Sequence, residues 1–268
     1  KKRVGLRTIK VVMEDDKDGK SFYFVVNGQP MFAKGSNLIP DDALLPNITT
    51  ERYYQLVKDA KDANHNMIRV WGGGIYEDDR LYDAADEMGI LIWQDFIFAC
   101  TTYPSDPTFL RRVSEEAEYN IKRLRSHASL AMWCGNNEIY EGMRYWGWDK
   151  KYSNPAIWEE MKEGYNKLFH QLLPSIVKEL DADRFYMHGS PYEANWGRPH
   201  SWKIADSHNW GTWYGQKPFE SLDTELPRFM SEYGFQAFPE MKTIATFAEP
   251  KGNDGCRKAI WEHPRRCT

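Results

Sequence analysis

The sequence predicts an α/β fold, a (β/α)8 barrel of the TIM type that is incomplete at its C-terminus because the last βα unit is missing. After an initial hairpin, strand and helix signals alternate along the chain, and seven strand positions are mostly separated by helices. In addition, Glu138 and Glu232 each close a short apolar run that gives way to polar sequence. Catalytic residues of such barrels lie at the C-terminal ends of strands, which is where both glutamates are expected.

The expected elements follow from local patterns. Alternating or continuous apolar runs predict strands, here residues 4–13, 22–26, 31–35, 67–71, 90–94, 130–133, 184–188, 204–208 and 228–231. Amphipathic runs predict helices, here residues 49–63, 78–88, 107–126, 155–180 and 239–247. Asn27-Gly28 is a hairpin turn, Thr49 or Thr50 is an N-cap, and Gly89 ends a helix. Pro174 should break or kink the long helix that contains it.

The end of the chain does not supply an eighth strand. Residues 249–268 are rich in Gly, Pro, Arg and Lys. An open α/β sheet is the structural alternative, but it would leave the two glutamates without a reason to converge.

Composition limits the possible partners. The chain has 268 residues, 41% of them hydrophobic, and a formal net charge of −4, which fits one large soluble domain. Neither nucleic acid nor an anionic membrane is an expected partner. No apolar run approaches the roughly 20 residues that span a bilayer. The start lacks the apolar core of a signal peptide, and the compartment is not predicted.

The cysteines do not indicate a metal or redox site. Their positions lie far apart, without metal-ligand spacing: Cys100, Cys134, Cys256 and Cys267. Cys134 is most simply a small buried apolar residue. No metal, no cofactor and no essential disulfide are expected.

The two glutamates together suggest glycoside hydrolysis. Cleaving a glycosidic bond needs one carboxyl group to protonate the leaving oxygen and another to attack or stabilise the anomeric carbon. A structural ion pair with a lysine or arginine explains either glutamate alone equally well. Tryptophans in expected loops, among them Trp146, Trp196 and Trp210, fit a sugar-binding surface because an aromatic face matches the apolar face of a pyranose.

Five segments carry a family resemblance: residues 66–74 (NMIRVWGGG), 93–95 (WQD), 133–138 (WCGNNE), 207–210 (SHNW) and 231–234 (SEYG). Together they resemble the catalytic barrel of β-mannosidases in glycoside hydrolase family 2, over residues 4–247. The resemblance implies a retaining exo-β-mannosidase that removes terminal β-D-mannose from manno-oligosaccharides or glycans. It implies Glu138 as general acid/base and Glu232 as nucleophile.

The resemblance also implies a domain division. Residues 1–13 are similar to the last strand of an immunoglobulin-like domain, and residues 14–268 would form the truncated catalytic barrel. The parent polypeptide would contribute an N-terminal sugar-binding β-domain and C-terminal β-sandwich modules. Residues 252–268 depart from the family pattern.

Residues near the strand ends are candidates for supporting the two carboxylates. Arg69 is expected to keep Glu232 ionised, with a structural ion pair as the alternative, and Tyr214 to donate a hydrogen bond to it. The acid should instead have its pKa raised by burial and by the neighbouring anion. By resemblance, Asn137 contacts the sugar 2-hydroxyl, and Asn136 is the weaker candidate. Asp95 could bind sugar hydroxyls or cap a junction.

The remaining candidates would line the pocket. Trp71 precedes three glycines that allow close backbone approach, so its ring can form a wall. These glycines lack the spacing and lysine of a phosphate-binding loop. Trp146 and Trp196 are stacking candidates, with core or hinge packing as the alternative. His208 either lines the pocket as a hydrogen-bond donor or is a strand-end histidine whose hydrogen bonds are all made within the protein.

Two other readings stay open. Another exo-β-glycosidase of the same family is possible: a galactosidase, glucuronidase or glucosaminidase. Residues 71–74 argue against a galactosidase or a glucuronidase, whose barrels usually carry a His-Tyr-Pro-like segment there. Glu138 argues against a glucosaminidase, because aspartate is associated with that position in the glucosaminidases. A different class is a catalytically silent carbohydrate-binding barrel fragment, whose open seam would favour aggregation or dimerisation.

Overall fold

A computed structural model describes residues 4–152, 154–193, 195–198, 200–235 and 239–246. The chain divides into two compact units, Lys1–Tyr233 and Gly234–Thr268. The second unit contains helix α7 (Met241–Ile244), which lies within the helix expected at residues 239–247. Residues 249–268, in which no eighth strand is expected, fall outside the described residues. Among the described helices, none has the length and apolar character needed to cross a membrane.

Parallel strands organise the first unit. A five-stranded sheet has the order β10-β9-β8-β7-β6, with bounds β6 (Gly35–Leu38), β7 (Met67–Val70), β8 (Leu91–Asp95), β9 (Leu130–Cys134) and β10 (Phe185–Met187). A second parallel pair is formed by β11 (Asp206–Asn209) and β12 (Phe229–Tyr233). The α/β class with a parallel sheet is therefore confirmed. Within the described residues the two sheets do not close into a barrel, so a complete barrel is not confirmed.

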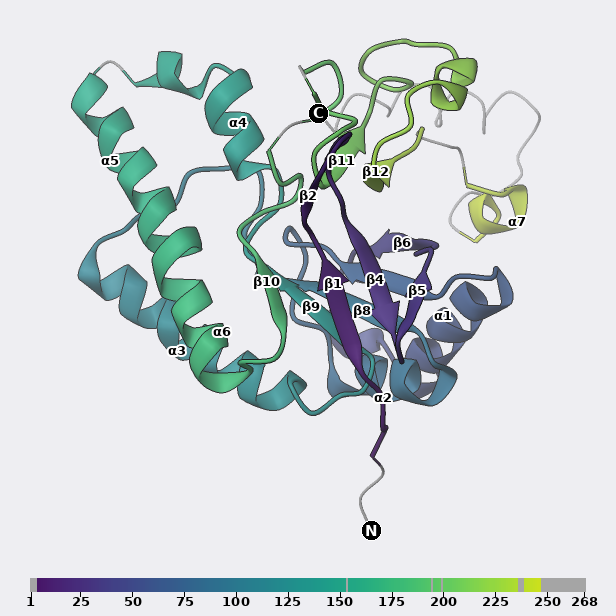
Figure 1. The fold of residues 1–268 in the computed structure, drawn as a ribbon. Coiled ribbons are helices and arrows are strands. Elements are labelled where there is room, and N and C mark those ends of the chain that lie inside the picture. Colours follow the sequence, from purple (N-terminus) through teal and green to yellow (C-terminus); the bar gives the residue numbers. More distant parts are fainter. Residues whose placement is uncertain (1–3, 153, 194, 199, 236–238, 247–268) are drawn as a thin grey trace. The chain divides into compact units, whose positions relative to one another are not determined.

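Helices connect the parallel strands and cover the outer face of the five-stranded sheet (Figure 1). They are α1 (Thr50–Asp62), α2 (Asp79–Met88), α3 (Pro107–Leu124), α4 (Ile139–Tyr145), α5 (Pro155–Tyr165) and α6 (Leu173–Leu180), with short turns η1 (Leu45–Asn47), η2 (Trp148–Lys151) and η4 (Phe219–Asp223). Thr49 caps α1, Asp78 caps α2, and Gly89 ends α2 with a positive φ of 73°. The local signals for these helix ends were interpreted correctly.

Pro174 interrupts the long helix expected over residues 155–180. The chain forms α5, then a π-helical segment η3 (Asn166–Leu172), and then α6, in whose first turn Pro174 lies. Proline has no N–H and its ring clashes with the carbonyl four residues earlier, so the regular α-helical ladder cannot continue through it. The expected break or kink takes the form of this change to a π-helical segment directly before α6.

The opposite face of the sheet is covered by an N-terminal hairpin. Strand β1 (Ile9–Val12) pairs antiparallel with β4 (Tyr23–Val26), and the small hairpin β2 (Asp15–Asp16) and β3 (Gly19–Lys20) lies between them in sequence. Phe22 and Phe24, both almost fully buried, pack with Met67, Trp93 and other side chains that point away from the helices. This apolar layer, called the floor below, lies beneath the polar C-terminal ends of the strands.

One strand prediction was misplaced. The segment expected at residues 31–35 splits: β5 (Gln29–Met31) pairs with β4 across the Asn27-Gly28 turn, and the parallel strand β6 begins only at Gly35. Because β6 has the sequence Gly-Ser-Asn-Leu and lies at a sheet edge with mostly exposed residues, it carries no apolar signal.

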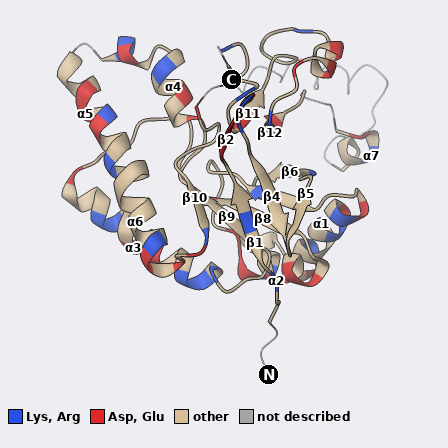
Figure 2. Ribbon diagram, viewed as in Figure 1, with Lys and Arg blue, Asp and Glu red and all other residues tan. Residues whose placement is uncertain are grey.

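Charged side chains lie mainly on the helices and loops. In Figure 2, basic and acidic residues are mixed along α3 and α5, while the sheet strands are mostly uncharged. This distribution accords with the small net charge of −4.

Candidate active site

Polar side chains converge at the C-terminal ends of the parallel strands. The structure brings together six of the ten predicted site residues: Arg69, Asp95, Asn137, Glu138, His208 and Glu232. They come from β7, β8, the segment after β9, β11 and β12. Glu232 lies within β12 rather than beyond it, and its side chain is 7% exposed.

Arg69 is the hub of this cluster. Its Nη1 donates to Glu232 Oε1 at 2.7 Å, and its Nη2 donates to Asp95 Oδ2 at 2.8 Å and to Asn137 Oδ1 at 2.9 Å. Burial alone would lower the pKa of Arg69, but the charges of Asp95 and Glu232 outweigh it and raise that pKa. Arg69 is therefore a permanent cation beside Glu232.

Glu232 has further donors, and they differ from the expected one. Trp210 Nε1 donates to Glu232 Oε2 at 3.2 Å, and His208 Nδ1 lies 3.3 Å from the same oxygen. Tyr214, the expected donor, is 68% exposed, and its backbone N–H bonds to the carbonyl of Trp210. Its role in the site stays a prediction.

Glu138 is held by both its backbone and its side chain. It has a left-handed φ of 58°, and its N–H donates to the Ser190 carbonyl at 2.8 Å. Its Oε1 lies 2.8 Å from His208 Nδ1 and accepts from Asn195 Nδ2 at 3.2 Å. Such strained conformations in non-glycine residues cluster at functional sites.

The electrostatics of Glu138 correct one expectation. Burial by itself raises the pKa of this carboxyl, as predicted, but the hydrogen bond and charge of His208, together with the charge of Arg69, lower it overall. Burial likewise lowers the pKa of His208, but Glu232 and Glu138 raise it overall. The two pKa shifts have opposite directions because each group stabilises the charged form of the other.

Asn137 and Asp95 are buried, and both side chains are hydrogen-bonded within the site. Asn137 forms parallel bridges with Ala99 on one side and Ser190 on the other, which fixes the segment that carries Glu138. Asp95 accepts hydrogen bonds from Arg69, from Trp93 Nε1 at 2.8 Å and from Gly72 N at 2.9 Å. Any contribution of Asp95 to sugar binding would therefore act through the position of Arg69.

The predicted pocket tryptophans lie close to strand ends and loops. Trp71 has its ring against Gly73, where an added Cβ would lie 2.0 Å from it. Trp146 is 39% exposed and packs edge-on against Trp148, with ring centroids 5.6 Å apart. The backbone N–H of Trp196 donates to the His208 carbonyl at 2.9 Å, so Trp196 adjoins the polar cluster. Stacking on a sugar stays a prediction for all three.

A cavity of about 460 Å³ opens beside the cluster. Its walls include the two facing sheet edges at residues 35–37 of β6 and 229–233 of β12, together with Arg69, Trp93 and Trp210. Asn37 Nδ2 donates across the gap to the Ser231 carbonyl at 3.2 Å. The space is large enough for a sugar ring and is bounded by Glu232.

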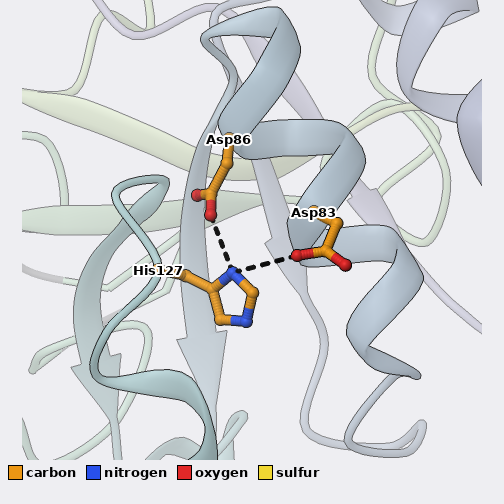
Figure 3. A group of neighbouring side chains, drawn as sticks. All are labelled: Asp83, Asp86 and His127. Atoms are coloured by element: carbon orange, nitrogen blue, oxygen red, sulfur yellow. Dashed lines mark hydrogen bonds and ion pairs between the residues drawn. The ribbon is translucent and has the colours of Figure 1, made fainter. Parts of the chain in front are cut away.

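A separate cluster is formed by Asp83, Asp86 and His127 (Figure 3). It lies near the N-terminal end of β9, whereas the candidate site lies at the C-terminal ends of the strands. Asp86 Oδ2 lies 2.8 Å from His127 Nδ1, and its Oδ1 accepts the Ser129 N–H at 2.6 Å. Asp83 Oδ1 lies 3.9 Å from His127 Nδ1. These contacts connect α2 to the loop before β9, so hydrogen bonding accounts for the cluster.

Several residues of the site were missed or only partly anticipated. Trp210 donates to Glu232, and the signal that points to it in the sequence is its place among the tryptophans of the expected loops. Asn195 lies in a loop with no pattern of its own. Cys100 Sγ lies 3.9 Å from Glu138 Oε2, and burial, followed by the charge of Glu138, raises the pKa of this thiol to about 12.

Comparisons with known proteins show which proteins the chain is similar to. No protein-family model matches the chain. It is 43% identical over 254 residues to β-mannosidase B of Neosartorya fischeri, which covers 92% of this chain and 30% of that protein. It is 42% identical to β-mannosidase B of Aspergillus niger over the same shares. The chain thus spans about 30% of the length of these curated relatives.

Solved structures give the same result. The β-D-mannosidase of Dictyoglomus thermophilum matches with a TM-score of 0.82 and 42% identity, over 92% of this chain and 29% of that one. A β-glucuronidase of Bacteroides uniformis matches with a TM-score of 0.59 and 19% identity, over 88% and 28%, which shows a shared fold alone. The resemblance stated from the five segments is confirmed: the chain is related to the β-mannosidases and corresponds to one segment of these longer proteins.

Proposed function

We propose that this chain forms the catalytic part of a retaining exo-β-mannosidase. The observation that carries the proposal is the meeting of Glu138 and Glu232: one oxygen of each, together with a ring nitrogen of His208, lies within 4.8 Å of the others. Carboxyl groups about 5 to 5.5 Å apart are typical of retaining glycosidases, whereas inverting enzymes need about 6.5 to 9.5 Å to admit a water. The spacing favours the retaining reaction.

In the first step, Glu138 donates the proton that it shares with His208 to the glycosidic oxygen. A Glu232 oxygen attacks the anomeric carbon as the bond to the leaving group breaks, so the leaving group departs as an alcohol. Arg69 and the Trp210 indole keep Glu232 ionised and oriented before this attack.

In the second step, a water replaces the leaving group. Glu138, now a carboxylate, takes a proton from the water, whose oxygen attacks the anomeric carbon while the bond to Glu232 breaks. The sugar leaves with its original configuration, and the proton returns to the pair. Asn137 is proposed to contact the sugar 2-hydroxyl from its place between Arg69 and Cys100.

The sugar is proposed from the relatives. The proteins at 42% and 43% identity are named β-mannosidases, and this supports terminal β-D-mannosides of oligosaccharides or glycans as substrates. Trp71, Trp146 and Trp196 are the proposed aromatic walls, with Tyr214 at the exposed rim.

The proposal extends to the architecture. The seven parallel strands β6 to β12 are taken as seven strands of a (β/α)8 barrel, with the cavity between β6 and β12 at the unpaired seam. Residues 1–13 are proposed as the end of a preceding immunoglobulin-like domain, although residues 9–12 pair here with β4.

The test is release of product from aryl β-glycosides of mannose, glucose, galactose, glucuronic acid and glucosamine. It compares this chain with a chimera in which the chain replaces the matched segment of the Dictyoglomus enzyme. Mannoside-selective turnover by the chimera, lost on Glu232→Ala, is the expected result. Turnover of another sugar would mean that the pocket has been misassigned, and a folded chimera without activity would contradict the catalytic assignment.

A further inference from the structure

A buried series of hydrogen bonds lies behind His208, on the side of the ring away from Glu138. It runs from His208 Nε2 to Ser190 Oγ at 3.0 Å and on to Asp206 Oδ2 at 2.6 Å. We propose that Asp206, acting through Ser190, fixes His208 with its Nε2–H toward Ser190 and its Nδ1 toward Glu138, so that the imidazole and the carboxyl hold one proton between them. The use of this proton in catalysis rests on the proposed function, whereas the proton arrangement does not.

The hydrogen bonds of Asp206 are those of a carboxylate. This side chain is fully buried, and each of its contacts is a donor. Ser190 Oγ and Ser231 Oγ each donate to Oδ2 at 2.6 Å, and the backbone N–H of Tyr192 donates to Oδ1 at 2.7 Å. An ionised carboxylate only accepts, so it satisfies all three donors at once.

Ser190 passes this constraint to the ring. A serine hydroxyl has one hydrogen, and the short contact to Asp206 takes it. Toward His208 the Ser190 oxygen can then only accept, so Nε2 must carry a hydrogen. Because His208 is fully buried, water cannot offer an alternative partner.

The opposite ring nitrogen faces acceptors. Nδ1 lies 2.8 Å from Glu138 Oε1 and 3.3 Å from Glu232 Oε2. A neutral ring with hydrogen on Nε2 presents a lone pair at Nδ1, which would repel two carboxylates. The 2.8 Å contact therefore needs one proton, on the imidazole or on Glu138.

The surrounding charges favour retention of this proton. The ionisable groups that face the pair from neighbouring elements are Arg69, Asp95, Cys100, Glu141, Asp206 and Glu232. Four of these are carboxyl groups, and Arg69 is already shared between Asp95 and Glu232. Asp206 differs from the others because it acts from behind the ring, through the Ser190 hydroxyl that contacts Nε2.

Ser190 and Asp206 are therefore positioning residues. They keep Nδ1 directed at the candidate acid and add negative charge behind an imidazolium, which raises its affinity for the proton. Without the hydrogen bonds of Ser190 and Asp206, His208 should release its proton at lower pH. The ring could then also adopt the tautomer with its hydrogen on Nδ1.

The test is nitrogen NMR of this chain labelled with ¹⁵N-histidine, with the His208 signals assigned by their loss in His208→Gln. In the wild type, Nε2 should carry hydrogen at all pH values, and Nδ1 should lose its proton on titration. Ser190→Ala should give a mixture of tautomers, and Asp206→Asn should move the titration to lower pH. Ser231→Ala is the matched control, since it removes an equally short bond to the same Asp206 oxygen and leaves the bonds from Ser190 to Asp206 and His208 in place. Ser231 Oγ makes only a long contact of 3.4 Å with Ser190 Oγ.

Two results would overturn the proposal: a lone pair on Nε2 in the wild type, or an unchanged tautomer and titration in folded Ser190→Ala. Because the readout needs no turnover, it separates this inference from the proposed function. In an active chimera, Asp206→Asn should lower kcat/KM for an alkyl mannoside about tenfold or more on the alkaline side, with little change for a dinitrophenyl mannoside, which needs no acid.

Discussion

Arg69 and Glu232 are 163 positions apart in the sequence, and a 2.7 Å hydrogen bond joins them. Arg69 belongs to the five-stranded sheet and Glu232 to the two-stranded one. This bond therefore connects the two sheets at the level of the candidate site, and the same guanidinium holds Asp95 and Asn137.

Replacing Arg69 should destabilise the fold as well as the site. Arg69→Met leaves Asp95 and Glu232 without their buried cation, which costs about 3 to 5 kcal/mol of unfolding free energy when one partner of a buried pair is lost. Urea unfolding measures it. Arg111→Met is the control, because Arg111 forms an exposed pair with Glu115 whose removal should change stability little.

The two glutamates should respond differently to the leaving group. In an active chimera, Glu138→Ala should lower kcat about 10²- to 10⁴-fold for alkyl mannosides but much less for dinitrophenyl mannoside, whose departure needs no proton. Glu232→Ala should abolish turnover of both. Equal losses for both substrates in Glu138→Ala would contradict its role as the acid.

The pair of Glu138 and His208 should make stability depend on pH. The pKa of His208 is raised above its usual 6.5, so its contribution is complete below that pH and is lost as pH rises through the folded value. The pKa of Glu138 is lowered from 4.5, so its contribution is present above that pH and is lost on acidification through its folded value. Both groups therefore contribute fully to the unfolding free energy between pH 4.5 and pH 6.5.

Unfolding free energies of the wild type and His208→Asn, compared from pH 5 to 9, check this. The difference should shrink as pH rises above 6.5. The same substitution made in Glu138→Gln should show a weaker pH dependence, because Glu138 is one cause of the raised pKa. A difference that stays constant with pH would contradict the shift.

The three consecutive glycines should not be equivalent. An added Cβ at Gly72 would lie 2.5 Å from the Phe98 carbonyl oxygen, which is backbone and cannot move aside, whereas at Gly74 the nearest atom is a Pro40 side-chain carbon at 3.2 Å. Thermal unfolding should therefore show a loss of about 1 to 3 kcal/mol for Gly72→Ala. Gly74→Ala is the matched control and should cost less.

The floor should contribute strongly to stability. Phe22 is 2% exposed, and its ring lies 5.0 Å from that of Phe229 and 5.7 Å from that of Trp93. Phe22→Ala should cost about 3 to 5 kcal/mol, measured by urea unfolding. An exposed aromatic residue, Tyr119, provides the control substitution Tyr119→Ala, with little expected change.

Residues at strand ends could be anticipated because a local pattern reports them. The apolar runs before Glu138 and around Arg69 mark buried parallel strands, whose ends must meet on one side of the sheet. Strand β6 gave no such pattern, since an edge strand of Gly-Ser-Asn-Leu buries little apolar surface.

Contacts between loops and strand ends could not be anticipated in this way. Which ring donates to Glu232, Trp210 or Tyr214, depends on how the loop after β11 turns. Likewise Asp206 lies in a strand whose four residues are all polar and all buried, so burial could not be read from hydrophobicity. The direction of the Glu138 pKa depends on His208, 70 positions away.

The apolar floor also determines how the site responds to salt. The Arg69 guanidinium lies 5.4 Å from the Trp93 ring centre, and the side chains of Arg69, Asp95 and Glu232 are only 4%, 0% and 7% exposed. Counterions weaken charge pairs that they can surround, such as the exposed pair of Lys122 and Glu118. Counterions cannot surround Arg69 and its carboxylates in this way. The ion pairs of Arg69 with Asp95 and Glu232 should therefore persist at ionic strengths that weaken the exposed ion pairs on the helices.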